Sequence, residues 1–222
     1  MAIPTIKPPS IEEIRSIRTI EGNEPLVKIA ETQKILILKE NQFLLPFARK
    51  SVVENLINAS ENLPAGHKFL IVTAYRPLSF QKKLWRQRLW QMIKKKPLRY
   101  ILNPLSLFQD ASKYTARPGG SSHQTGAAID LTIIDQNNKR LDMGTELTDF
   151  GEKCHTSCSD ISSEQKNNRE ILYKTMIESG FVNYPREWWH YSYGDRAWSV
   201  MNNKKECDYG ALKFERSDII KK

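Results

Sequence analysis

Residues 121–134 read SSHQTGAAIDLTII, a polar loop that runs directly into a stretch of small and β-branched residues. The second half of this stretch, residues 127–134, predicts a strand, and residues 69–73 (FLIVT) predict a buried one. Three more segments suit strands: residues 34–39 (KILILK), 181–184 and 188–193. Residues 135–139 suit a turn, and residues 140–143 could form the strand that returns from it.

Apolar side chains at helical spacing predict three helices around these strands. One covers residues 47–63, one lies between Ser79 as its N-cap and Pro97 as its stop, and one covers residues 162–179. The fold expected from these elements is α+β: a small, mainly antiparallel sheet flanked by helices.

The length of 222 residues fits one domain, and 40% hydrophobic residues can build a real core. We therefore expect residues 1–222 to form a single domain. Within it, residues 1–45 predict an irregular lead-in, residues 98–122 predict a loop, and residues 196–222 form a tail that matches no motif.

The net charge of +9 raises the question of an anionic partner. Lysine and arginine are spread along the chain, and the one dense run, residues 94–96, suits a helix end where the dipole favours cations. We therefore expect neither a nucleic acid nor a membrane as partner. The start of the chain, residues 1–13, carries no apolar leader, which predicts a cytoplasmic protein. No feature indicates an oligomeric state.

Three cysteines are too few for a disulfide framework in a chain of this length. Cys154 and Cys158 frame the segment CHTSC, which leaves two readings open. One is a metal knuckle, and the other is a pair of reduced thiols near a loop. The second is favoured, because the C-x₂-C spacing of ordinary zinc sites is missing.

A candidate metal site uses two of the four histidines. His123 stands at the entry to the strand that carries Asp130, and His190 follows Glu187 by three residues. A catalytic zinc ion takes three protein ligands and keeps one position open for water, whose pKa it lowers to roughly 7. A glutamate beside a ligand can take the proton of that water and return it to a leaving amine.

Three blocks of sequence resemble the motifs of the zinc D,D-peptidases, the group that contains the D-alanyl-D-alanine dipeptidases of vancomycin resistance and related carboxypeptidases. Residues 121–130 match S-x-H-x-x-G-x-A-x-D, residues 187–190 (EWWH) are similar to E-x-W-H, and residues 75–77 (YRP) resemble a third motif. The family's usual glycine and acidic residue before that third motif are Ala74 and Thr73 here.

The resemblance implies roles for the matching residues and a zinc site in a cleft. His123, Asp130 and His190 would hold one Zn²⁺ per chain, and Glu187 would be the general acid/base. Arg76 would stabilise the carbonyl oxygen as it becomes an oxyanion. Ser121 and Asp149 would lie near the ends of the substrate, although Ser121 could instead shape its loop and Asp149 could cap a helix. His155 is expected to be structural.

The dipeptidase branch is favoured by the spacing between the blocks and by further similar segments at residues 143–150 and 167–169. We therefore predict a zinc peptidase that hydrolyses D-alanyl-D-alanine, which is a cytoplasmic precursor. The alternatives are a D,D- or L,D-carboxypeptidase that trims peptidoglycan stem peptides, a noncatalytic binding module that retains zinc, and a basic nucleic-acid binder.

Overall fold

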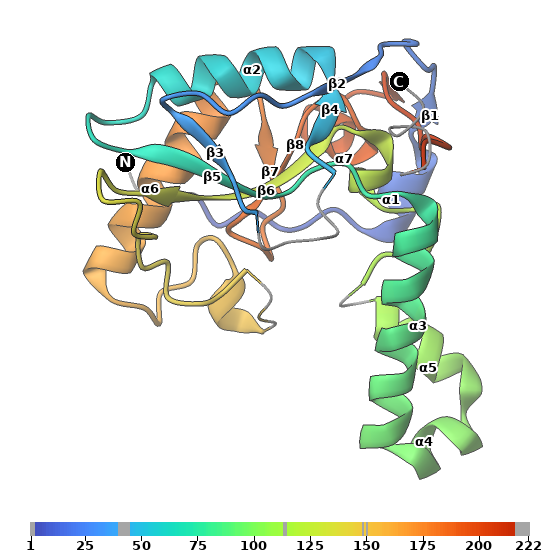
Figure 1. The fold of residues 1–222 in the computed structure, drawn as a ribbon. Helices are drawn as coiled ribbons and strands as arrows, with labels where there is room; N and C mark the ends of the chain where they lie inside the picture. The colour runs from blue at the N-terminus through green and yellow to red at the C-terminus, as the bar shows by residue number, and fades with distance from the viewer. Residues whose placement is uncertain (1–2, 40–44, 113–114, 148, 150, 216–222) are drawn as a thin grey trace.

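The computed structural model describes residues 3–39, 45–112, 115–147, 149 and 151–215 (Figure 1). Its centre is a five-stranded sheet in the order β3-β5-β6-β8-β7. Only β3 and β5 are parallel, so the sheet is mainly antiparallel, as predicted. The strands are β3 (Ile35–Ile37), β5 (Lys68–Thr73), β6 (Ala128–Ile134), β7 (Val182–Asn183) and β8 (His190–Ser192).

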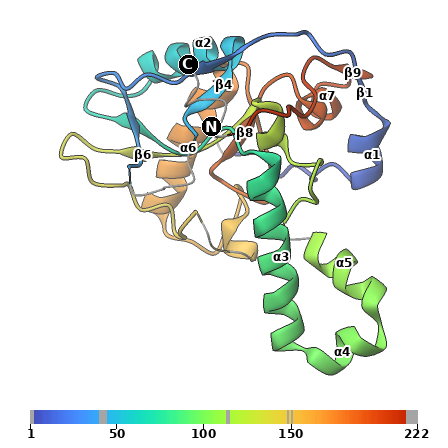
Figure 2. The ribbon, with the colours of Figure 1, turned by 45° about the vertical axis from the view of Figure 1, so that its right-hand side comes forward.

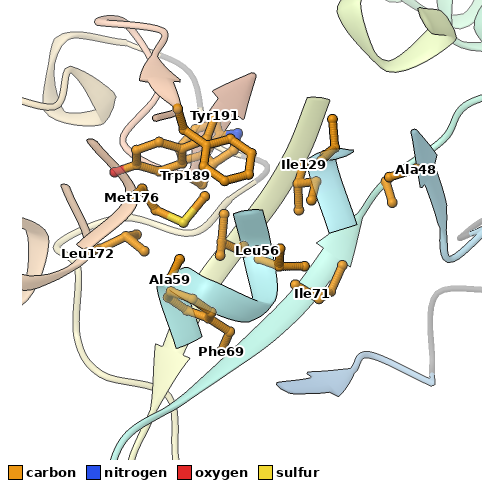
Figure 3. Close-up of a cluster of buried hydrophobic side chains, with 14 of the residues drawn as sticks. Ala48, Leu56, Ala59, Phe69, Ile71, Ile129, Leu172, Met176, Trp189 and Tyr191 are labelled. Atoms are coloured by element: carbon orange, nitrogen blue, oxygen red, sulfur yellow. The ribbon is translucent and has the colours of Figure 1, made fainter. Parts of the chain in front are cut away.

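Two helices, α2 (Lys50–Glu61) and α6 (Ser163–Glu178), pack together over one face of the sheet (Figure 1). The close-up in Figure 3 shows Leu56 from α2 and Leu172 from α6 in the same apolar cluster as Ile129 of β6. Because side chains alternate along a strand, Asp130 must face the opposite side from Ile129. The apolar core therefore lies on one face of β6 and the polar side chain on the other.

The sheet register aligns three residues from three strands. Asp130 on β6 is paired with His190 on β8, and on its other side with Thr73 at the end of β5. A slip of one residue would turn Asp130 into the core, so the apolar face fixes this register.

The two ends of the chain are more ordered than predicted. Helix α1 (Ile11–Ser16) and strand β1 (Arg18–Thr19) belong to the lead-in, and α7 (Arg196–Met201) and β9 (Glu206–Cys207) to the tail. Strand β1 pairs with β9, and β2 (Leu26–Lys28) pairs with β4 (Phe47–Arg49). Strands this short carry no readable pattern, and pairing across the whole chain decides them.

The loop predicted for residues 98–122 is wrong. It contains α4 (Pro97–Leu102) and α5 (Pro104–Ser112), which pack on α3 (Leu78–Lys95) to form a hairpin that projects from the body (Figures 1 and 2). Proline ends a helix but is also favoured in the first turn of the next one, and Pro97 stands at the start of α4. The predicted cap is also wrong: α3 starts at Leu78, and the Ser79 hydroxyl donates to Glu215.

Smaller differences concern element ends. The helix expected over 47–63 begins only after β4, at Lys50, and the strand expected over 140–143 is reduced to one bridge between Arg140 and Ile134. The third helix is confirmed, with Ser162 and Gln165 forming a capping box. No helix in the described ranges has the length and apolar character needed to cross a membrane. Residues 1–222 as one domain stays a prediction.

Candidate metal centre

Three side chains of the predicted metal site come together on the polar face of the sheet. His123 lies in η1 (Ser122–Thr125), Asp130 on β6 and His190 on β8. The Nε2 atom of His123 is 3.2 Å from Asp130 Oδ2, and His190 Nδ1 is 2.9 Å from Asp130 Oδ1. One donor atom from each residue lies within 4.8 Å of the others, and within the described ranges this is the one such group of His, Cys, Asp or Glu.

The orientation of His123 is set by the backbone. Its Nδ1 is 2.9 Å from the carbonyl oxygen of Ala74 and donates to it, which leaves the lone pair of Nε2 facing Asp130. The short helix that carries His123 ends at Gly126, where φ is 74°. A Cβ there would also require the side chain of Leu26 to move, so this left-handed turn from η1 into β6 favours glycine.

The charges of the three groups are coupled. Burial alone would raise the pKa of Asp130, but the two histidines hold it well below its usual range. Burial lowers the pKa of His123. Burial also opposes protonation of His190, but the hydrogen bond to Asp130 and the negative charges of Asp130 and Glu187 together outweigh it and raise the pKa of His190. A carboxylate that stays ionised between two imidazoles presents a negative charge to any cation that enters.

This donor set fits a divalent metal. Tetrahedral zinc with bonds of about 2.0–2.2 Å separates its ligand atoms by roughly 3.4 Å, and one donor atom from each of the three residues lies within 4.8 Å of the others. Two imidazole nitrogens and one carboxylate oxygen are a common catalytic zinc set, and the arrangement leaves a fourth position for water. The expectation that the site lies in a cleft stays a prediction.

Arg76 stands beside the cluster with an unused donor. Its Nη1 donates to Gln81 Oε1 at 3.1 Å, and its Nη2 is 3.9 Å from Asp130 Oδ2. Its Nε is buried and has no hydrogen-bond partner in the described part of the chain. A buried N–H without a partner is costly, and a substrate oxygen would satisfy it. Burial also lowers the pKa of Arg76, yet guanidinium stays charged at neutral pH.

Glu187 lies in the tight turn between β7 and β8, three residues before His190. Burial raises its pKa, and it is close enough to His190, Asp130 and Arg76 for their charges to act on it. The turn is held by Asn183, whose side-chain amide donates to the carbonyl oxygens of Glu187 and His190 at 3.0 and 3.1 Å. Glu187 is therefore a carboxylic acid of raised pKa held beside the metal cluster.

The two predicted substrate residues have different surroundings. Ser121 is buried at the start of η1, two residues from His123. Asp149 is exposed, and its Oδ2 accepts from the backbone N–H of Glu146, so it closes a local turn. The loop before α6 is organised by Arg169, which donates to the carbonyls of Met143, Lys153 and His155. His155 takes part in this network through its backbone carbonyl. Cys154 and Cys158 are free thiols.

Two positioning residues were missed by sequence reasoning. Gln81 is fully buried on α3, where it links Arg76 to the carbonyl oxygen of Ala116, and Asn183 is buried under the Glu187 turn. An amide side chain carries no recognisable chemical motif. The only available signal was their distance in sequence from the motifs: Gln81 follows Arg76 by five residues, and Asn183 precedes Glu187 by four.

A buried His–Asp–His cluster with a carboxylic acid and an arginine beside it is the arrangement of a metal-dependent hydrolase. The chain belongs to the peptidase family M15, described as D-Ala-D-Ala dipeptidase, whose model matches residues 29–209. This confirms the resemblance seen in the motifs, and zinc as the expected metal follows from the family and the donor set.

Individual relatives carry the same description. The chain is 25% identical over 167 residues to a D-alanyl-D-alanine dipeptidase of Synechocystis sp., covering 66% of this chain and 68% of the relative. It is 29% identical over 127 residues to the Escherichia coli protein of that name, covering 57% and 55%. The chain thus spans about half to two thirds of these relatives. Among solved structures, the LD-carboxypeptidase LdcB matches 92% of this chain and 83% of its own, with 19% identity and a TM-score of 0.49.

Proposed function

We propose that this chain is a zinc dipeptidase that hydrolyses D-alanyl-D-alanine. The observation that carries the proposal is the buried His–Asp–His cluster with Glu187 and the unpaired Arg76 N–H at its edge. The substrate follows from the family and from the relatives that bear this activity as their name.

In this proposal the metal is held by His123, Asp130 and His190. A zinc ion bound there would supply a Lewis acid and an activated water. The chain's own part is to keep three donors in place: Ala74 fixes the ring of His123, and the sheet register fixes Asp130 against His190. A preorganised donor set loses little entropy on binding a metal.

Glu187 would act as the proton carrier. In its ionised form it would accept one proton from water as the oxygen adds to the scissile carbonyl carbon. It would then give that proton to the leaving amine as the carbon–nitrogen bond breaks, so the carboxylate is regenerated. The raised pKa suits this double role, because a group whose pKa lies nearer neutrality both takes and gives a proton readily.

Arg76 would bind the substrate carbonyl oxygen as negative charge develops on it. Its buried Nε–H meets no hydrogen-bond acceptor among the residues that the structure describes, and its Nη1 donates to Gln81. A preorganised donor of this kind contributes about 10²–10³ in kcat. Ser121 and Asp149 would bind the ends of the dipeptide, and Asp149 is chemically suited to its ammonium group. We place the reaction in the cytoplasm, where the free dipeptide is formed.

The direct test is D-alanine release from D-alanyl-D-alanine and from a muropeptide pentapeptide, each with and without a chelator. Chelator-sensitive release from the dipeptide alone is the expected result. Release from the pentapeptide instead would make the chain a carboxypeptidase. No release from either substrate, with zinc retained, would make it a binding module and contradict the proposal.

A further inference from the structure

The α3–α5 hairpin, residues 78–112, concentrates the positive charge of the chain. It holds eight lysine and arginine residues and a single acidic residue, Asp110. The net charge of these 35 residues is therefore +7, out of +9 for all 222. Asp110 itself is paired with Arg99 at 2.7 Å.

The far end of the same hairpin exposes large aliphatic side chains. Leu98, Ile101, Leu102 and Leu105 are 70–82% exposed; the first three follow one another at helical spacing on α4, and Leu105 lies in the first turn of α5. This end points away from the body in both views (Figures 1 and 2). The inner side of the helices is packed instead through Tyr100 and Leu107, so the exposed residues are not needed to hold the hairpin together.

A tryptophan on α3 extends this pattern. Trp90 is 63% exposed, and it lines a shallow hollow together with Lys83, Arg86 and Lys94. An exposed indole between cations is typical of side chains that lie at a membrane–water interface, where the ring enters the headgroup layer. Exposed aliphatic residues flanked by lysines have the same preference.

Charge decides between possible occupants of this surface. A second copy of the chain would bring two hairpins of charge +7 together, which opposes a symmetric contact. A nucleic acid would match the charge but offers nothing for four exposed aliphatic side chains. An anionic lipid bilayer matches both features, because its headgroups attract the lysines and its acyl boundary accepts the apolar residues.

We propose that the tip of the α3–α5 hairpin docks on anionic lipid bilayers, with Leu98, Ile101, Leu102 and Leu105 entering the headgroup region. Helix α3 begins two residues after Arg76, and its 18 residues span about 27 Å. Docking through the tip therefore holds the metal site at up to this distance from the lipid. This proposal does not depend on the proposed dipeptidase activity, and it revises the expectation of no membrane partner.

The test is flotation of the full zinc-loaded chain with vesicles of phosphatidylcholine alone or mixed with an equal part of phosphatidylglycerol. We expect binding only to the mixed vesicles, and weaker binding as salt is raised. Leu102→Glu and, separately, the pair Lys94→Glu with Lys95→Glu should each lower the partition coefficient at least tenfold.

The matched controls make the same kinds of substitution, apolar to acidic and basic to acidic, at exposed residues outside the hairpin. Ile57→Glu on α2, where Ile57 is 43% exposed, and the pair Lys139→Glu with Lys166→Glu should retain vesicle binding within about twofold. Equal binding to neutral vesicles, no binding to anionic ones, or equal loss in the control variants would overturn the proposal. So would a concentration-dependent dimer that Leu102→Glu disrupts, or tighter binding to RNA than to vesicles.

Discussion

The metal-site face of the sheet and the α3–α5 hairpin are built in opposite ways. On the sheet, polar side chains are buried, paired with one another and fixed by strands that meet across 60 residues, as Asp130 and His190 do. On the hairpin, apolar side chains are exposed, and the helices that carry them are neighbours in sequence. Buried polar groups that are hydrogen-bonded to one another are typical of catalytic or metal sites. Exposed apolar groups among cations are typical of a surface that binds another molecule or a membrane.

The two regions meet at Arg76, which lies 3.9 Å from Asp130 and is separated from α3 by a single residue, Pro77. Substitutions in each region should therefore differ in what they change: chemistry and folding for the sheet, surface behaviour for the hairpin.

The largest effect is expected at Glu187. Glu187→Gln keeps the shape of the side chain but removes the proton carrier, so kcat should fall by about 10³ while zinc content stays the same. Steady-state kinetics and metal analysis on one preparation measure both quantities. Glu178→Gln, an exposed site on α6, is the control and should change neither. Loss of zinc in Glu187→Gln would make Glu187 a ligand instead.

The next effect compares one leucine from each region. Leu56 on α2 is fully buried against the sheet, and Leu102 is 82% exposed at the hairpin tip. Leu56→Ala should lower the free energy of unfolding by about 2–5 kcal/mol, because it leaves a cavity. Leu102→Ala should change it by less than about 0.5 kcal/mol. Urea denaturation measures both, and a comparable loss in Leu102→Ala would show that the tip is part of the folded core.

A smaller effect is expected at Gln81, where the hairpin supports the site. Gln81→Leu removes the hydrogen bond to Arg76, so kcat should fall about tenfold with KM and zinc content nearly unchanged. Gln91→Leu, an exposed site on the same helix, is the control. If the two variants behave alike, Gln81 has no part in positioning the guanidinium.

The smallest effect concerns pH. The pKa of His190 in the folded chain without metal is raised, because its protonated ring pairs with Asp130. This pairing stabilises the fold at low pH, and the stabilisation is lost as the pH rises through the raised pKa. Zinc requires the neutral ring, so protons compete with it. The gain in Tm from zinc should therefore increase from about pH 5 to about pH 8. A gain that is constant over this range would remove the histidines from the metal site.

Sequence patterns predicted the sheet side of the molecule well. The strands predicted over residues 127–134 and 69–73 are found as β6 (Ala128–Ile134) and β5 (Lys68–Thr73), because their apolar residues pack against α2 and α6 and that burial follows directly from local composition. The three candidate ligands do meet, because Asp130 and His190 pair on neighbouring strands and His123 lies in the short helix η1 just before β6. Their roles as ligands, and those of Glu187, Arg76, Ser121 and Asp149, stay predictions.

The hairpin escaped prediction for physical reasons. Its two later helices have six and nine residues, too short for a clear apolar period, and each opens with a proline that also reads as a break. The positive charge of the hairpin is readable in the sequence, but as a shortage of acidic residues: residues 78–112 contain only Asp110, and a search for dense lysine and arginine runs finds residues 94–96 alone. Gln81 and Asn183 were missed because their role depends on contacts and not on residue type.

The central claim is that His123, Asp130 and His190 form the zinc site at which the dipeptide is cleaved. The most direct test measures zinc content and D-alanine release together in the wild type and in Asp130→Ala. The wild type should carry one zinc per chain and release D-alanine, and the variant should lack both while remaining folded by circular dichroism. Full zinc occupancy in folded Asp130→Ala would contradict the account.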